Sequence, residues 1–239
     1  HLVIDSRRIF TPEHTLFFAL EGERHDGHDF IGDLWQKGVR NFVVSHLPDA
    51  TETTAGANMI RVPNTLAALQ QLAAHHRNRF DYPVIGITGS NGKTIVKEWI
   101  YHLLEGKYHV VRSPKSYNSQ VGVPLSVWNM SVEYNLAVFE AGISRPMEMQ
   151  RLENIIQPTI GIFTNIGEAH QENFRDFRQK IREKLNLFEE VEAIIYCKDH
   201  ETIHKEITGH DQLRQKRLVT WSVQGDADLN VEDAEVNQS

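Results

Sequence analysis

One stretch of the chain restricts its possible folds more than any other. The apolar run Val84–Thr88 (VIGIT) predicts a buried strand, and Thr94–Leu104 predicts the helix that follows it. The turn between them contains Gly89 and Gly92 and ends in Lys93. Glycines let backbone N–H groups face a phosphate without an intervening Cβ, and a helix N-terminus adds partial positive charge. The stretch therefore predicts a phosphate-binding loop.

The residues of this loop have separate predicted roles. Lys93 can reach the outer phosphates of a nucleotide, and the hydroxyl of Thr94 can bind Mg²⁺. Ile87 stands where the general pattern has its first glycine, so the alternative is a plain glycine-rich turn. The position of Gly-Lys-Thr at the junction of strand and helix favours nucleotide binding. The predicted nucleotide ligands in the loop are Gly89, Ser90, Asn91, Gly92, Lys93 and Thr94.

The rest of the chain alternates short apolar runs with helical patterns. Strands are predicted at Leu16–Leu20, Asn41–Ser45, Asn58–Val62, Val84–Thr88, His109–Arg112, Asn135–Ala141, Thr159–Thr164, Ala193–Cys197 and Leu218–Ser222. Helices are predicted at Thr65–Arg79, Thr94–Leu104, Pro146–Ile156 and Phe174–Val191. Such alternation indicates a parallel sheet covered on both faces. We expect an α/β protein: a small N-terminal α/β domain, then a P-loop-type, mostly parallel sheet with helices on both faces, incomplete at its C-terminal end.

A proline after polar residues, in Asp81-Tyr82-Pro83, precedes the first strand of the larger sheet. We place the domain boundary there, with residues 1–82 in one domain and 83–239 in the other. The acidic tail Gly225–Ser239 has no strong period and is interpreted as a stub of further structure.

Composition excludes several classes of protein. The net charge of −7 and the lack of a basic stripe argue against a nucleic-acid binder. No apolar run reaches the ~18 residues of a membrane-spanning helix. The single cysteine, Cys197, fits a reducing cytoplasm. We expect a cytoplasmic protein without a membrane span, most simply a monomer.

Two further strands deliver polar groups to the edge where the phosphate loop lies, since ligands bind beyond the carboxyl ends of parallel strands. Glu140 ends one strand, and Thr164 to His170 follows another. A carboxylate ending an apolar strand is costly unless it is paired or binds a cation. We propose Glu140 and His170 as Mg²⁺ ligands; the alternatives are an exposed strand end and an ordinary loop histidine.

Lys184 flanks the apolar stripe of the last predicted helix, between Ile181 and Phe188. By spacing alone it is a snorkelling lysine, with its stem on the apolar surface and its ammonium in water.

Several segments, in order, resemble the Mur ligases, which are ATP-dependent amino-acid or peptide ligases of peptidoglycan synthesis. They are Asp5-Ser6-Arg7, Leu16–Ile31, Thr88–Thr94, Asn118–Leu125, Phe139-Glu140-Ala141-Gly142 and Thr164–His170. The resemblance runs from Asp5 to about Phe188. It implies a uridine-nucleotide domain first and an ATP domain second, and the family's C-terminal ligase domain is expected to be absent here.

The resemblance also implies a role for each matching residue. Lys93, Asn165 and the loop would hold ATP, and Thr94 and Glu140 would hold Mg²⁺. A second Mg²⁺ would bind His170. Lys184 aligns with a lysine that many members carbamylate, although Leu185-Asn186 replaces the Gly-Glu that follows it in the family. Lys93, His170 and Lys184 are thus the implied catalytic residues. The UDP-sugar substrate would contact Ser6, Arg7, Asn118 and Ser119.

Within the family, the stretch from Glu140 to His170 is most similar to the branch that adds D-Ala-D-Ala to UDP-MurNAc-tripeptide through an acyl phosphate. The implied partners are ATP, Mg²⁺, the UDP-MurNAc-peptide and D-Ala-D-Ala, and this chain by itself is expected to be inactive. One alternative is a folylpolyglutamate-synthase-like ligase, against which Asp5 to Ile31 argues. The other is a non-catalytic nucleotide-binding region, for example of a fusion with an alanine racemase.

Overall fold

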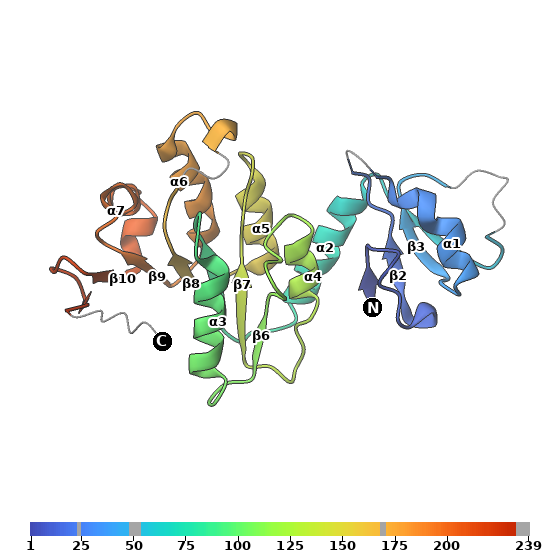
Figure 1. Ribbon diagram of the computed structural model, residues 1–239, viewed down its shortest axis with the longest axis horizontal. Coiled ribbons are helices and arrows are strands. Elements are labelled where there is room, and N and C mark those ends of the chain that lie inside the picture. The colour runs from blue at the N-terminus through green and yellow to red at the C-terminus, as the bar shows by residue number, and fades with distance from the viewer. Residues whose placement is uncertain (23–24, 48–53, 168–170, 233–239) are drawn as a thin grey trace, which may run out of the picture. The chain divides into compact units, whose positions relative to one another are not determined.

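The computed structural model describes residues 1–22, 25–47, 54–167 and 171–232 (Figure 1). The chain forms two compact units, His1–Ala73 and Ala74–Ser239. No helix in the described ranges is both long enough and apolar enough to cross a membrane.

The N-terminal unit is a parallel sheet with its strands in chain order. The strands are β1 (Leu2–Val3), β2 (Leu16–Phe18), β3 (Asn41–Val44) and β4 (Asn58–Arg61), and each pairs in parallel with the next. The helical segments are η1 (Pro12–His14), η2 (Gly27–Phe30) and α1 (Ile31–Gln36). The core is built from β2, β3 and α1, where Phe17, Phe42 and Leu34 are fully buried. Burying these aromatic and aliphatic side chains supplies the main driving force for folding this unit.

The second unit is a larger parallel sheet in the order β11-β10-β9-β8-β5-β7-β6 (Figure 1). Its strands are β5 (Val84–Thr88), β6 (Val110–Arg112), β7 (Leu136–Glu140), β8 (Ile160–Phe163), β9 (Ala193–Cys197), β10 (Arg217–Ser222) and β11 (Leu229–Asn230). Its helices are α3 (Lys93–Leu104), α4 (Gly122–Val127), α5 (Glu148–Ile156), α6 (Phe177–Leu185) and α7 (Glu201–Thr208), with short η3 (Gln171–Asn173), η4 (Asn186–Phe188) and η5 (Leu213–Gln215). The helix α2 (Thr65–Arg77) begins in the first unit and ends in this one. The expected α/β class with parallel sheets is confirmed.

Helices and turns cover both faces of the central strand β5, because successive side chains of a strand point to opposite faces. Ile85 and Ile87 pack in one cluster with Val96 and Ile100 of α3. On the opposite face, a Cβ on Gly86 would lie 2.8 Å from Pro158 Cβ and 3.5 Å from Leu187 of η4.

The register of β5 brings three loops to one edge of the sheet. Ile87 pairs with Glu140 at the end of β7, and Thr88 pairs with Phe163 at the end of β8. Since all three strands are parallel, the loops that follow them must meet at the same edge.

Several predicted boundaries differ from the structure. The predicted helix Phe174–Val191 is shorter, because the Asp176 carboxylate accepts from Gln179 N at 2.7 Å and caps α6 at its start. The helix predicted from Pro146 begins at Glu148, since Met147 has a left-handed backbone (φ 66°). The tail from Gly225 contains strand β11, which the sequence did not predict, and α1, α4 and α7 were also missed.

The boundary between the compact units also lies earlier than the predicted one at residue 82. The last turn of α2 belongs to the second unit because its side chains bind there. His76 Nε2 lies 3.0 Å from Met130 O, and Arg77 is buried against the carbonyl ends of α5.

Candidate functional site

The loop between β5 and α3 depends on glycine at Gly89. Its φ is 143°, and a Cβ there would lie 2.0 Å from Thr164 Oγ1. The loop after β8 holds the loop after β5 in place: Ser90 N donates to Asn165 O at 2.8 Å, and Asn91 N donates to Asn165 Oδ1 at 2.9 Å. Asn165 is therefore a structural support of the loop as well as a predicted nucleotide ligand.

Lys93 is the first residue of α3, and its side chain turns back over the loop. The ammonium donates to Gly89 O at 2.9 Å and to Ser90 O at 3.1 Å. Burial lowers the pKa of Lys93, while Glu140 acts in the opposite direction. Its position beside the loop backbone suits the binding of an anion, whose charge would offset that of a partly buried ammonium.

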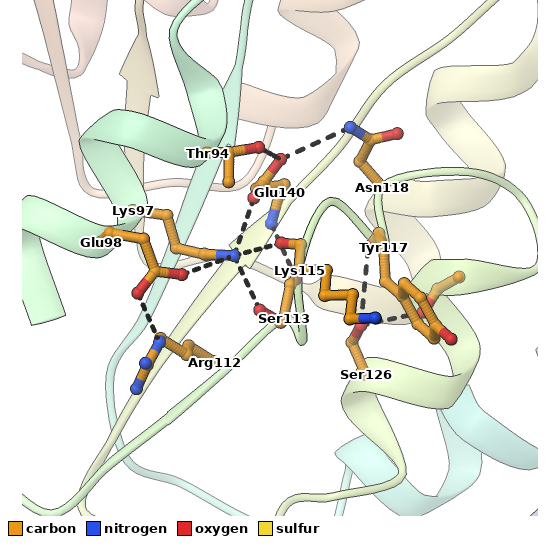
Figure 2. Close-up of polar contacts among 11 residues, drawn as sticks. Thr94, Lys97, Glu98, Arg112, Ser113, Lys115, Tyr117, Asn118, Ser126 and Glu140 are labelled. Atoms are coloured by element: carbon orange, nitrogen blue, oxygen red, sulfur yellow. Dashed lines mark hydrogen bonds and ion pairs between the residues drawn. The ribbon is translucent and has the colours of Figure 1, made fainter.

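Glu140 is fully buried at the end of β7, so the alternative of an exposed strand end is wrong. Its Oε2 accepts from Thr94 Oγ1 at 3.0 Å and lies 3.4 Å from Asn118 Nδ2. The structure thus brings Thr94 and Glu140 together from separate elements, as the strand-end argument predicted (Figure 2).

Lys97 is the residue of this site that the sequence analysis missed. It is fully buried, one turn after Lys93 on α3, with its Nζ 3.0 Å from Glu140 Oε1 (Figure 2). The contact meets the distance of an ion pair but is not a hydrogen bond, so Oε1 has no hydrogen-bond partner among the described residues. The two groups therefore form an ion pair between side chains that are both inaccessible to water. The only signal in the sequence was the spacing of four residues from Lys93 to Lys97.

The oxygen atoms at this edge suit Mg²⁺. This ion prefers hard oxygen ligands and usually takes one or two protein ligands plus substrate phosphates and water. Thr94 Oγ1 and Glu140 Oε2 supply such a pair at 3.0 Å from each other. The other carboxylate oxygen, Oε1, forms an ion pair with Lys97, so Oε2 is the oxygen that faces the loop. His170, the other predicted metal ligand, lies outside the described residues.

Lys184 lies inside the protein, so its interpretation as a snorkelling lysine is wrong. Only 3% of its surface is exposed, and its Nζ donates to Gly89 O at 3.0 Å, the same carbonyl that Lys93 contacts. Burial, together with the charges of Lys93 and Lys180, lowers the pKa of Lys184 to about 7. Lys180 is also buried and donates to Gly167 O. The helical spacing did not reveal the burial of Lys180 and Lys184. It does not show that α6 packs the side bearing these two lysines against the loop.

A pocket of about 420 Å³ lies beside these lysines. Its walls come from the loop after β5, the segment before α4, the segment after β7, the first residues of α3 and α5, and one residue of α6: Gly89, Ser90, Lys93, Asn118, Ser119, Gln120, Val121, Gly142, Ile143, Ser144, Glu148 and Lys184. The predicted substrate ligands Asn118 and Ser119 thus share a pocket with Lys93 and Lys184. A pocket of this volume is large enough for part of a small substrate.

The other two predicted substrate ligands, Ser6 and Arg7, lie in the N-terminal unit. There the Asp5 carboxylate accepts from Arg7 Nε at 2.9 Å, and this bond lowers the pKa of Asp5 to about 2. Arg7 is thereby held by a neighbour while most of its side chain stays exposed.

A second group of possible metal ligands, Glu21, His28 and His46, also lies in the N-terminal unit. All three converge on the hydroxyl of Ser45, which lies 3.2 Å from His28 Nε2 and 3.0 Å from His46 Nδ1. His28 Nε2 also accepts from Ser45 N at 3.0 Å. Ser45 therefore already contacts two of the three candidate ligand atoms, since its hydroxyl donates to Glu21 Oε1 and its backbone N–H donates to His28 Nε2.

Two family profiles match the chain. The Mur ligase middle domain matches residues 87–239, and the catalytic domain of the Mur ligase family matches residues 1–77. A curated relative, the UDP-N-acetylmuramoyl-tripeptide–D-alanyl-D-alanine ligase of Bacillus subtilis, is 36% identical over 82% of this chain and 42% of its own length. The ligase of the same name from Treponema pallidum is 39% identical over 70% of this chain and 37% of its own length. The chain therefore spans less than half of these relatives.

Solved structures agree with these matches. MurF ligase from Thermotoga maritima in complex with ADP superposes with a TM-score of 0.80 at 26% identity, over 94% of this chain and 50% of that one. MurF from Acinetobacter baumannii gives a TM-score of 0.80 at 26% identity, over 92% and 47%. A complex of FPGS with AMPPCP has a TM-score of 0.55 at 15% identity, over 72% and 53%, which is a likeness of fold alone.

Proposed function

The chain belongs to the Mur ligase family, and on that premise we propose that it forms the substrate- and ATP-binding parts of an enzyme that joins D-Ala-D-Ala to UDP-MurNAc-tripeptide. The observation that carries the proposal is the contact of 3.0 Å between Thr94 Oγ1 and Glu140 Oε2 beside the phosphate loop. A hydroxyl and a carboxylate so close to this loop would suit the metal of a bound nucleotide.

Each part of the site has a role in this proposal. The loop from Gly89 to Gly92, with Asn165 behind it, and Lys93 would hold the phosphates of ATP. Thr94 and Glu140 would hold Mg²⁺, which offsets negative charge on the transferred phosphoryl group when it is bound. His170 would serve a second Mg²⁺. Asn118, Ser119, Ser6 and Arg7 would contact the UDP-sugar.

The reaction that fits this site is activation of a carboxylate. The γ-phosphoryl group of ATP passes to the terminal carboxylate of the tripeptide, and ADP leaves. The amine of D-Ala-D-Ala then attacks the acyl carbon of the acyl phosphate, and phosphate leaves as the amine loses a proton. Lys93 and the loop would act by positioning and by charge.

The remaining parts of the proposal concern the whole protein. Residues 1–82 would bind the uridine nucleotide, and residues 83–239 would bind ATP. The chain spans 42% of its Bacillus subtilis relative, so the activity proposed here is that of the full natural protein. We propose a monomer that works in the cytoplasm on small-molecule substrates.

Phosphate release by the full natural protein tests the proposal. We expect release from ATP to require both UDP-MurNAc-tripeptide and D-Ala-D-Ala. Lys93→Ala should reduce it by at least about 100-fold, because charge on the transferred group loses its nearest cation. Lys205→Ala, which changes an exposed lysine of α7, is the matched control and should retain full activity.

Two results would overturn the proposal. One is full turnover by a folded Lys93→Ala variant. The other is phosphate release that depends on a folate and glutamate, which would instead indicate a folylpolyglutamate-synthase-like ligase. Nucleotide binding without turnover under any of these conditions would indicate a non-catalytic module.

A further inference from the structure

A fully buried lysine is rare, and the Nζ of Lys97 lies 3.0 Å from the Glu140 carboxylate of the proposed metal site. Neither Lys97 nor Glu140 exposes any surface to water. Burying an ammonium is costly unless it is paired and hydrogen-bonded. The contacts of Lys97 therefore indicate the function of its buried charge.

The ammonium of Lys97 has three N–H donors. It donates to Ser113 O at 2.8 Å and also to Lys115 O. Two carboxylate oxygens lie around the remaining donor, Glu140 Oε1 at 3.0 Å and Glu98 Oε1 at 3.1 Å. Lys97 thus joins α3 to the end of β7 and to the segment after β6 (Figure 2).

The segment from Ser113 to Asn118 contacts Glu140 at both of its ends, first at the backbone N–H and then at the carboxylate. Ser113 Oγ accepts from Glu140 N at 3.2 Å, and Asn118 Nδ2 lies 3.4 Å from Glu140 Oε2. Lys115 between them has a left-handed backbone (φ 50°) and turns its carbonyl to Lys97. The lysine therefore holds one oxygen of Glu140 while the other oxygen faces Thr94 and Asn118.

The surrounding charges keep this arrangement neutral as a whole. Glu98 bridges Lys97 and Arg112, whose Nε lies 3.1 Å from Glu98 Oε2. Burial raises the pKa of Glu98, but Lys97 and Arg112 together outweigh this effect and leave it below its ordinary value. Two cations and two carboxylates thus form one chain, and only Glu140 points from it toward the phosphate loop.

We propose that Lys97 is a positioning residue: its buried ammonium fixes the Glu140 carboxylate with Oε2 turned toward Thr94, and so determines how strongly Mg²⁺ tightens nucleotide binding. This inference rests on the proposed function, because it assumes that Glu140 and Thr94 hold the metal of the nucleotide. Lys97 itself touches neither the phosphates nor the metal in this account.

The test measures the Kd of ADP for the full natural protein, once in excess EDTA and once in excess Mg²⁺. The ratio of the two values is the gain that the metal supplies. Lys97→Met keeps the length of the side chain and removes the charge. It should reduce the ratio by about tenfold, the effect of losing a group that orients a metal ligand. The Kd in EDTA should change by less than about twofold, because Lys93 and the loop backbone are intact.

Two variants serve as controls. Glu98→Gln removes the other carboxylate that contacts Lys97 and should leave the ratio within about twofold of the wild-type value, because Glu98 does not face the loop. Lys97→Arg restores the positive charge and should recover part of the loss. A loss in Lys97→Met that is smaller in Lys97→Arg would be the mark of a charge that orients Glu140.

A double-mutant cycle separates this role from a general effect on folding. Glu140→Gln removes the partner through which Lys97 is proposed to act, so adding Lys97→Met should cause no further change in the ratio. The double variant carries a neutral pair and is expected to fold even where Lys97→Met alone does not, since replacing both members of a buried ion pair is often tolerated.

Each outcome decides one of the two proposals. If Mg²⁺ gives the wild-type protein no gain in ADP binding, the proposed metal site itself is wrong. If the wild type gains and Lys97→Met gains equally, the role of Lys97 is wrong. The role is also wrong if Lys97→Met weakens binding equally in EDTA and Mg²⁺, or if it lowers the ratio further in the Glu140→Gln background.

Discussion

Lys184 and Lys93 both donate to the carbonyl oxygen of Gly89, at 3.0 Å and 2.9 Å. Two ammonium groups that share one acceptor repel each other, and Lys180 adds a third positive charge nearby. Burial is the larger cause, and together these effects lower the pKa of Lys184 to about 7. A neutral amine is a nucleophile, so Lys184 is the lysine of this site best suited to react with CO₂.

We expect Lys184 to form a carbamate whose yield depends on pH. Because the lowered pKa lies near 7, the neutral amine is a minority at pH 6 and a majority at pH 8, so the yield should rise several-fold between them. The measurement is the carbamate signal in ¹³C NMR after addition of ¹³C-bicarbonate. Lys184→Met should abolish this signal, whereas Lys205→Met on the surface of α7 should leave it unchanged. A signal of equal size at both pH values would contradict the expectation.

Some residues of the site could be predicted from the sequence, and others could not. Thr94 and Glu140 lie together, as expected, because Glu140 ends β7, Thr94 lies in the first turn of α3 after β5, and parallel strands bring their ends to one edge. The burial of Lys97 and Lys184 was not predicted, because a lysine on a helix is exposed in most proteins. Their burial depends on how α3 crosses β7 and how α6 packs on the phosphate loop. The periodicity of a helix carries no information about such packing.

At the scale of the elements, strand β8 and η4 make a close contact that a glycine allows. A Cβ on Gly161 would lie 2.5 Å from the ring of Phe188. The ring of Phe188 also packs edge-on against Phe163, with centroids 6.4 Å apart. Gly161 thus lets an aromatic side chain lie directly on the backbone of a central strand.

Gly161→Ala should destabilise the protein by about 1–3 kcal/mol, because the new methyl group must displace a fully packed ring. Urea denaturation followed by circular dichroism measures this as a lower midpoint. Gly106→Ala is the matched control, since a Cβ there meets nothing within 4 Å. If the two variants unfold at the same urea concentration, the contact is looser than described.

The strands were the elements most open to prediction. The bounds of two strands, Val84–Thr88 and Ala193–Cys197, agree with the prediction. An apolar run of this length between polar stretches usually forms a buried strand. Helix ends were harder, since they depend on single caps such as Asp176 and on the left-handed Met147. Strand β11 was missed because its two residues, Leu229 and Asn230, are exposed and carry no apolar pattern.

At the scale of the whole molecule, α2 connects the two compact units, and Arg77 attaches its last turn to the second one. The guanidinium is buried and donates to Ile156 O at 2.8 Å, Gln157 O at 3.0 Å and Phe80 O at 2.6 Å. The first two carbonyls lie at the end of α5, where a cation is favourable. The Arg77 side chain therefore caps the C-terminal end of α5 and attaches the last turn of α2 to the second unit.

Arg77→Met should destabilise the second unit by about 2–4 kcal/mol, because it leaves buried carbonyls without a donor. Hydrogen exchange measured by mass spectrometry should show faster exchange in β5 to β9, while β2 and β3 of the first unit keep their protection. Arg79→Met changes an exposed arginine near the same helix end and should alter neither the stability of the second unit nor its hydrogen exchange. Equal loss of protection in both units would mean that they unfold together.

The order of strands in the larger sheet has a consequence for synthesis of the chain. β5 lies between β8 and β7, and both of these partners come later in the sequence. A ribosome adds roughly 5–20 residues per second, so the apolar strand at Val84 waits several seconds for its first neighbour at Leu136, about 50 residues on. During that interval the nascent polypeptide presents an unpaired hydrophobic segment to chaperones, and no nucleotide cradle can form until Asn165 has left the exit tunnel.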